Sequence, residues 1–171
     1  MADENKGRVA KKIELVANVG IVIVALLVGT LFVRNYLGQG SKPQSIAVGS
    51  KFKLKDVNWK ANGKTIVLAL STTCHFCTES APFYRELVKK AEAHNVRTIA
   101  VFPQSPTEAT TYLTAEEVKV GSIQQSLLPD IQVSGTPTVL LIDENGQVKA
   151  VWIGKLPAER EKDLLDKLGS S

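Results

Sequence analysis

The pattern of apolar and polar positions divides the chain into an apolar run, a polar stretch and a longer mixed region. Residues 15–33 are apolar except for Asn18 and Thr30, and residues 38–50 are rich in Gly, Ser, Gln and Lys. Such a polar stretch is typical of a flexible linker. Beyond it, short apolar runs alternate with amphipathic stretches, which indicates a globular domain. The predicted parts are a cytoplasmic N-terminal tail (1–14), a transmembrane helix (15–33), a linker (34–50) and a soluble domain (51–171).

The apolar run has the length of a bilayer-spanning helix, which needs about 20 such residues. Four cations, Lys6, Arg8, Lys11 and Lys12, precede the run, whereas Arg34 is the only cation directly after it. Positive charge is concentrated on the cytoplasmic side of membrane helices. We therefore expect a single-pass protein of the cell membrane with a cytoplasmic N-terminus and an extracytoplasmic domain, periplasmic or equivalent.

Two alternatives to a retained anchor are considered. A cleaved signal peptide has an apolar region of about 7–15 residues followed by small residues at a cleavage site. The run here is longer, and Phe-Val-Arg-Asn-Tyr at 32–36 contains no such site. A buried core helix rarely lacks a polar face over five turns. The retained anchor is favoured, and cleavage stays the alternative.

The soluble domain shows alternating and helical periodicities in sequence. Its predicted elements are a strand-like stretch at 52–59, a buried strand at 65–70, a helix at 78–94 kinked by Pro82, a buried strand at 96–102, a capped helix from Ser105 to about Glu117, an extended piece at 118–120, a short helix at 122–128, a hairpin of 138–142 and 147–153 around Asn145-Gly146, and a helix from Pro157 to Gly169. Strands joined by helices and followed by a hairpin indicate an α/β fold, with a central mixed sheet and helices on both faces.

The two cysteines of the chain form one short motif, Cys74-His75-Phe76-Cys77. A Cys-x-x-Cys between a buried strand and a helix is typical of thiol–disulfide chemistry. The first sulfur lies at the helix N-terminus, where unpaired N–H groups favour an anion. The second lies one turn further on the same helix face. Disulfides persist outside the cytoplasm, which agrees with the predicted location of the domain.

Together these motifs resemble the thioredoxin fold. Within it, the chain is similar to the membrane-anchored, extracytoplasmic TlpA/ResA-like thiol–disulfide oxidoreductases over residues 46–168. The similarity rests on the cysteine motif, on Pro82 eight residues after Cys74, and on Gly-Thr-Pro-Thr at 135–138 before a buried strand. The resemblance implies a protein disulfide or dithiol substrate, a membrane electron-donor protein as partner and no cofactor.

The resemblance also assigns roles to individual residues. Cys74 is the expected attacking nucleophile, because only a thiolate attacks a disulfide and the helix N-terminus lowers a cysteine pKa. Cys77 is the expected resolving cysteine. His75 is expected to tune the Cys74 pKa. Pro137 is expected to be cis, so that the Thr136 backbone can pair with an extended substrate. Phe76 is expected to contact substrate, the alternative being that it packs on the Pro137 loop.

Three features of the sequence depart from the usual thioredoxin pattern. Thr73 stands where thioredoxins usually carry Trp, and Leu68 stands where they carry a buried acid that helps to deprotonate the second cysteine. The dipeptide between the cysteines is His-Phe rather than Gly-Pro. These differences bear on the redox potential, the proton acceptor and the substrate. We predict that the protein is a reductase, and a disulfide-forming oxidase of the same fold is the alternative.

Other chemistries fit the sequence less well. A structural zinc site needs four ligands, and His94 is the only other histidine, so no metal is expected. Haem attachment requires His directly after the second cysteine, where Thr78 stands. Peroxidases of the peroxiredoxin type carry a proline at the position where this chain has Val67. A structural disulfide over so short a loop stabilises little. A redox-inactive binding module would not need an intact pair, and no basic cluster suggests nucleic acid.

Overall fold

The computed structural model describes residues 19–31 and 46–169 of the chain, and its contacts divide the chain into two units, 1–42 and 43–171. In the first unit, residues 19–31 form a helix with every side chain exposed. The predicted tail, residues 15–18 and 32–33 of the predicted membrane helix, and residues 34–45 of the predicted linker lie outside the described residues. Over the two described ranges, no helix combines the length and the apolar character needed to cross a membrane.

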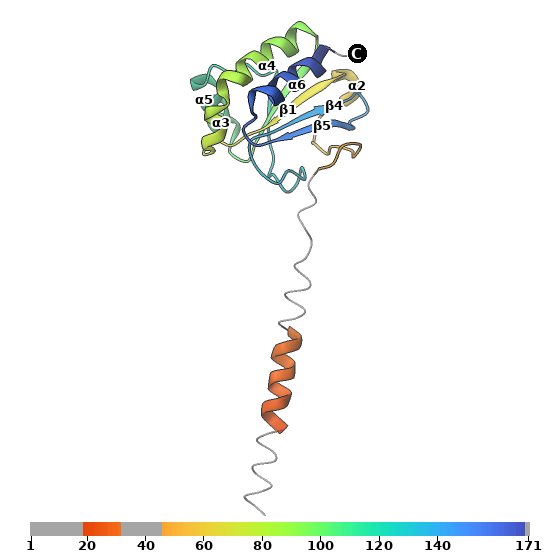
Figure 1. Cartoon of the computed structure of the whole chain (residues 1–171), viewed down its shortest axis with the longest axis vertical. Coiled ribbons are helices and arrows are strands. Elements are labelled where there is room, and N and C mark those ends of the chain that lie inside the picture. Colours follow the sequence, from red (N-terminus) through yellow and green to blue (C-terminus); the bar gives the residue numbers. More distant parts are fainter. Residues whose placement is uncertain (1–18, 32–45, 170–171) are drawn as a thin grey trace, which may run out of the picture. The chain divides into compact units, whose positions relative to one another are not determined.

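The second unit is built on a five-stranded mixed sheet with the strand order β3-β2-β1-β4-β5 (Figure 1). The strands are β1 (Thr65–Ala69), β2 (Arg97–Phe102), β3 (Ser122–Gln125), β4 (Thr138–Ile142) and β5 (Val148–Ile153). The first three are parallel, and β4 pairs antiparallel with both β1 and β5. Every residue of β1 and β4 is buried, as expected of central strands covered on both faces. The mixed sheet and the closing hairpin are thus confirmed.

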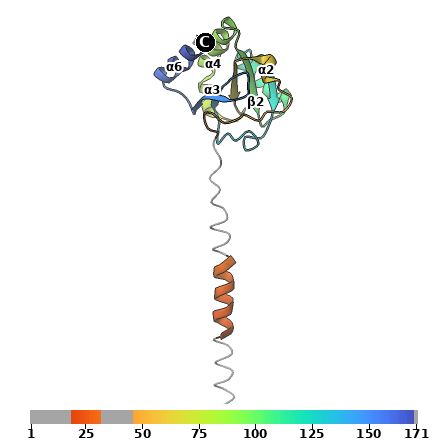
Figure 2. The same cartoon turned by 90° about the vertical axis from the view of Figure 1, so that its right-hand side faces the viewer.

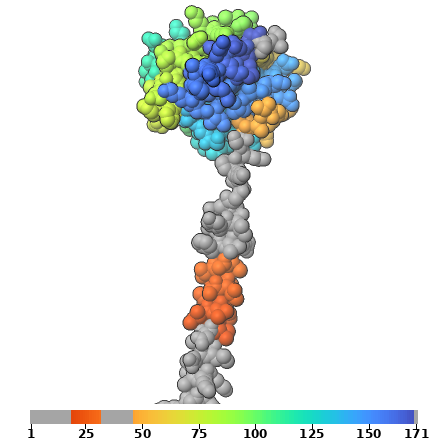
Figure 3. All heavy atoms as spheres, viewed as in Figure 1, coloured from red at the N-terminus to blue at the C-terminus, as the bar shows by residue number. Residues whose placement is uncertain are grey.

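Three longer helices pack on one face of the sheet. They are α4 (Ala81–Ala93), α5 (Pro106–Ala115) and α6 (Ala158–Gly169), and their apolar side chains join Ile66, Leu68 and Leu70 in one cluster. The steps from β1 to β2 and from β2 to β3 run in the same direction across the sheet. Because parallel crossovers are right-handed, α4 and α5 fall on the same face. Helix α6 lies beside α4 on the surface (Figures 1 and 3).

The opposite face has a different cover. Its cluster contains the alternate β1 residues Val67 and Ala69, together with Ile46, Phe52 and Ile131 from connecting segments. Among the described residues, the helix on this face is the one-turn α2 (Trp59–Asn62), which lies across the sheet from α4 and α6 (Figure 2). Helices were predicted on both faces of the sheet, and on this face the short α2 is the one that the structure describes.

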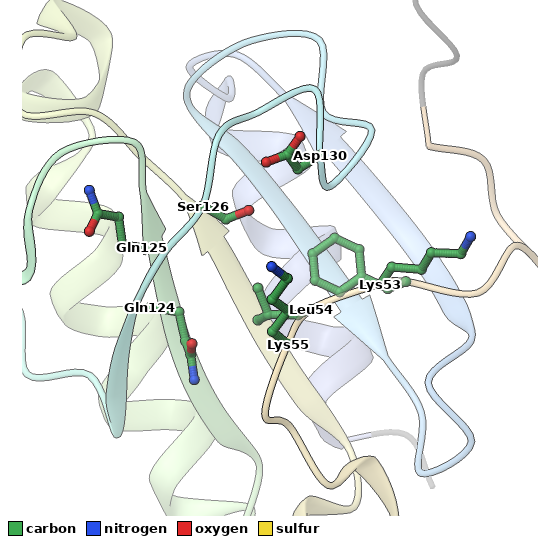
Figure 4. Close-up of a pocket in the computed structure, with 8 residues that line it drawn as sticks. Lys53, Leu54, Lys55, Gln124, Gln125, Ser126 and Asp130 are labelled. Atoms are coloured by element: carbon green, nitrogen blue, oxygen red, sulfur yellow. The ribbon is translucent and has the colours of Figure 1, made fainter.

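A groove of about 660 Å³ opens on this second face between two connecting segments (Figure 4). Lys53, Leu54 and Lys55 lie on one side of it, and Gln124 of β3 and Asp130 lie on the other. Its lining mixes cationic, anionic and amide groups.

Two predicted elements are wrong. Residues 52–59 do not form a strand: Lys51 makes an isolated bridge to Gln147, and the following residues run as a loop into α2. Residues 122–128 do not form a helix, since Ser122–Gln125 is strand β3, paired with β2. In both cases the deciding contacts lie far away in the sequence.

The predicted kinked helix at 78–94 consists of two helices. Helix α3 (His75–Glu79) starts directly after Cys74, and α4 begins at Ala81 with Pro82 in its first turn. A proline in the first turn costs no hydrogen bond, so the chain restarts a helix at Ser80 instead of bending one. The helix thus begins three residues earlier than predicted, which places Cys74 at its N-cap.

Candidate active site

Cys74 lies where the sheet passes into the first helix. The Leu70 N–H donates to the Val101 carbonyl at 2.9 Å, a bond that extends the pairing of β1 with β2 by one residue, and a turn then leads to Cys74. As the N-cap of α3, the Cys74 side chain accepts a hydrogen bond from the Cys77 N–H at 3.3 Å. A sulfur can take the place of the usual oxygen at an N-cap. The motif spacing therefore directs a backbone donor at the first sulfur.

The two thiols have very different surroundings. Both are free, with Cys74 half-buried and Cys77 fully buried. Burial raises the pKa of the Cys77 thiol to about 12, and its side-chain hydrogen bond with Cys74 adds to the rise. Partial burial also acts to raise the pKa of Cys74, but hydrogen bonds from the Cys77 and Thr136 side chains and from backbone N–H groups outweigh it, so that pKa is lowered. Cys74 is thus the thiol that ionises first.

Thr136 and Pro137 lie against the cysteine pair, as the resemblance implied. The Thr136-Pro137 peptide bond is cis, which confirms that expectation. The Cys74 thiol donates to the Thr136 carbonyl at 3.4 Å across 62 positions of sequence. This contact places the loop before β4 at the more exposed sulfur. A role of Thr136 and Pro137 in binding substrate stays a prediction.

The two residues between the cysteines point outward. The His75 side chain is 79% exposed, and its Nε2 lies 3.1 Å from Oε1 of Glu79. The other carboxylate oxygen of Glu79 binds Lys155 Nζ at 3.0 Å, and this hydrogen bond is the main reason why the pKa of Glu79 is lowered. The Phe76 ring is 54% exposed. The imidazole therefore contacts a carboxylate, and its tuning of Cys74 stays a prediction. Phe76 offers an apolar surface next to the sulfur.

Leu68 is fully buried in the cluster that also contains Cys77. The apolar residue at this position removes the carboxylate that thioredoxins usually carry. An apolar environment disfavours the charged form of a thiol, in agreement with the raised pKa of Cys77.

Two polar residues at the site were not predicted from the sequence. Gln104, which follows β2, donates through Nε2 to the Ser71 hydroxyl at 2.9 Å. Tyr112 of α5 lies 3.3 Å from the Thr78 hydroxyl. The only sequence signal for Gln104 is a polar residue just beyond a buried strand, where parallel strands end side by side. Across residues 19–31 and 46–169, no three His, Cys, Asp or Glu side chains gather as metal ligands would.

Comparisons with known proteins agree with this geometry. The sequence model of the Redoxin family matches residues 39–168. No curated protein sequence matches the chain. Among solved structures, the chain is similar to a thiol:disulfide interchange protein described as DsbE from Chlorobium tepidum, with 23% identity, a TM-score of 0.56 and coverage of 73% of this chain and 100% of that one.

Two further solved structures share the fold. The thioredoxin domain of a thiol–disulfide oxidoreductase from Bacteroides vulgatus has 15% identity and a TM-score of 0.60, covering 74% of this chain and all of that one. StoA from Bacillus subtilis has 17% identity and a TM-score of 0.50, covering 71% and 96%. The fold is therefore thioredoxin-like. With its family match and its paired cysteines, the chain belongs to the Redoxin family and is a thioredoxin-like thiol–disulfide oxidoreductase.

Proposed function

We propose that this protein is a membrane-anchored reductase of protein disulfides that acts outside the cytoplasm. The observation that carries the proposal is the asymmetry of the two thiols. Cys74 is accessible and has a lowered pKa, whereas Cys77 is buried and has a raised one. A dithiol reductase needs this difference between its thiols, because the first must be ionised to attack an external disulfide and the second must stay protonated until the mixed disulfide has formed.

The reaction proceeds in two exchanges. The Cys74 thiolate attacks one sulfur of the substrate disulfide, the substrate S–S bond breaks, and one substrate thiolate leaves. Cys77 then loses its proton and attacks the Cys74 sulfur of the mixed disulfide, which releases the second substrate thiolate. The substrate gains two electrons and two protons, and the Cys74–Cys77 pair becomes a disulfide. A dithiol on a membrane electron-donor protein returns the pair to its reduced form.

Contacts around Cys74 suit an extended substrate. The Thr136 carbonyl already lies at the sulfur, and the exposed Phe76 ring borders it. A backbone that pairs with the loop at Thr136 and Pro137 would bring its disulfide sulfur to Cys74. Phe76 would contact an apolar side chain of that substrate.

The sequence, and not the described helix, supports anchoring. Residues 15–33 have the composition of a spanning helix, and the cations before them favour a cytoplasmic N-terminus. An extracytoplasmic domain suits a cysteine pair that cycles through a disulfide. A tether to the membrane also suits the collection of electrons from a membrane-embedded donor.

The function is tested by insulin reduction and by trapping. The full chain should catalyse insulin reduction, iodoacetamide treatment of the reduced protein should abolish it, and peroxide should not be consumed at a comparable rate. A Cys77→Ser variant should accumulate mixed disulfides with extracytoplasmic proteins in cells. An inactive full chain would overturn the reductase assignment, and so would a protein that is mainly oxidised in growing cells with a potential near that of the oxidant DsbA, about −120 mV.

Topology is tested separately. A membrane-impermeant thiol reagent should label the reduced domain on intact cells. Recovery of the mature protein in a soluble extract, lacking residues 15–33, would contradict the anchor and leave the redox assignment in place.

A further inference from the structure

The turn between β1 and α3 carries Cys74 and lies outside the hydrogen-bond ladders of the strand and the helix. Backbone N–H groups in such a turn need partners from side chains or from neighbouring segments. The Cys74 N–H donates to the Ser71 carbonyl at 3.1 Å, and the Thr73 N–H points at the Ser71 hydroxyl at 3.4 Å. The Thr72 N–H points at Oε1 of Gln104, also at 3.4 Å. Ser71 and Gln104 thus account for all three N–H groups that lead to the nucleophile.

The Gln104 amide binds this turn with both of its ends. Its Oε1 accepts from Thr72, and its Nε2 donates to Ser71 Oγ at 2.9 Å. The two contacts have opposite hydrogen-bonding sense, so they fix which end of the amide faces which partner. Gln104 follows β2, next to β1 in the sheet, and is separated from the turn by about 30 residues of chain. It therefore ties the turn to the rigid sheet.

Ser71 transmits this restraint to both cysteines. Its hydroxyl also lies 3.1 Å from Thr73 Oγ1, and its side chain is buried. Its carbonyl accepts from the Cys74 N–H, and its backbone acts to lower the pKa of the Cys77 thiol, against the larger effect of burial. A shift of Ser71 would move one cysteine relative to the other.

We propose that Gln104 is a positioning residue for the redox reaction: by holding Ser71 and Thr72, it fixes the turn that aligns Cys74 with Cys77. The inference rests on the proposed thiol–disulfide function, but it concerns a side chain that touches neither sulfur. Within the part of the chain that the structure describes, no side chain other than Gln104 hydrogen-bonds this turn to the segment that follows β2, so removing the amide releases the turn from that segment. The Cys74 sulfur would then be held less well against the Cys77 N–H, which stabilises its thiolate.

The test uses the full chain with Gln104→Met, which keeps the side-chain length and removes both polar groups. The rate of Cys74 alkylation in the reduced protein is measured from pH 5 to 10, with Cys74 identified by peptide mass. We expect the midpoint to rise by roughly half to one pH unit, which lowers the rate below the midpoint by about three- to tenfold. The Gln104→Asn side chain is one methylene too short to make both contacts, so this variant should also raise the midpoint of the alkylation profile.

Two controls separate positioning from a general loss of structure. Gln124→Met changes the same residue type on the neighbouring strand β3 and should leave the alkylation profile unchanged. Because Gln104 acts in part through Ser71, a Ser71→Ala/Gln104→Met double variant should shift the midpoint by less than the sum of the two single effects. Single-turnover release of substrate from the mixed disulfide should slow in Gln104→Met by a similar factor.

The outcomes distinguish this inference from the function on which it rests. An unchanged alkylation profile in both Gln104 variants, in a protein whose wild type reduces insulin, overturns the positioning role alone. Additive shifts in the double variant also overturn it, since they would show that Gln104 does not act through Ser71. A shifted profile in a chain that never reduces disulfides supports the positioning role and overturns the proposed function.

Discussion

The two faces of the sheet are covered in different ways, and the comparison shows what each way permits. On the helical face, α4, α5 and α6 satisfy their own backbone groups, so an apolar stripe is enough to dock them. On the other face, segments without regular structure need individual partners. The Ile46 N–H donates to the Gln132 carbonyl, Gly49 to Val148, and Phe52 to Gly146. The cover of the helical face follows a regular apolar periodicity, whereas the cover of the other face depends on individual hydrogen bonds.

This difference explains where the chemistry lies. The start of α3 directs a backbone N–H at Cys74, and the helical cluster buries Cys77. The irregular face provides no helix start of this kind next to a cysteine. It leaves an open groove instead (Figure 4). We therefore expect substitutions on the two faces to separate activity from stability.

The largest expected effect is on turnover. Cys74→Ser removes the nucleophile and should abolish insulin reduction completely, while the unfolding midpoint changes little because the replaced side chain is half-buried. Phe52→Ala, on the opposite face, should keep the activity of whatever fraction stays folded. The comparison uses initial rates normalised to the folded fraction from circular dichroism. Residual turnover in Cys74→Ser would contradict the assignment of the nucleophile.

The next effect is on stability, where both faces should respond. Leu87 of α4 is fully buried, and Leu87→Ala should lower the free energy of unfolding by about 2–5 kcal/mol. Phe52 is 3% exposed in the irregular cover, and Phe52→Ala should lower it by about 3–5 kcal/mol. Urea unfolding measures both. A loss below about 1 kcal/mol for Phe52→Ala would show that the irregular cover is not an integral part of the core.

A pH effect should distinguish the two redox states. The raised pKa of Cys77 means that the folded reduced protein keeps a proton that the unfolded chain releases. Its contribution to stability is complete below the unfolded pKa, 9.0, and is lost as pH rises towards about 12. The lowered pKa of Cys74 acts oppositely and adds stability as pH rises towards 9.0.

The measurement is the difference in melting temperature between the reduced and oxidised forms as a function of pH. Tyr84 and Tyr112 titrate in both forms, so the part of their effect that comes from burial cancels in the difference. We expect the melting temperature of the reduced form to rise relative to that of the oxidised form up to about pH 9, and to fall relative to it above that pH. A difference that rises steadily through pH 10 would contradict the raised pKa of Cys77.

The smallest expected effect concerns the redox potential. A thiolate stabilised at Cys74 favours the reduced form, so we expect a potential of roughly −250 to −180 mV, above that of thioredoxin at about −270 mV. His75 is the first residue of α3, a position that accepts proline. His75→Pro should make the potential more reducing by roughly 10–30 mV if the imidazole favours the thiolate. Equilibration against glutathione measures it, and an unchanged value would remove His75 from the tuning of Cys74.

Local signals in the sequence predicted much of the helical face correctly. Ser105 and Glu108 form the predicted capping box at the start of α5, and the hairpin turns at Asn145-Gly146. The failures came from elements defined by distant partners. Ile123, Leu127 and Leu128 have nearly helical spacing, yet pairing of Ile123 with Ala100 makes this segment a strand. Phe52 is buried as the alternation suggests, but its segment pairs with the start of β5 only through the single bridge of Lys51 to Gln147.

The sequence by itself determined the reactive pair and which of its cysteines begins the helix. Three-residue spacing after a buried strand puts Cys74 at a helix start and Cys77 one turn inside, because these relations depend only on neighbouring residues. Tertiary structure alone decided that the Thr136 carbonyl and the Gln104 amide meet this turn. Those residues lie 62 and about 30 positions away, and no local periodicity encodes which ends of a folded sheet come together.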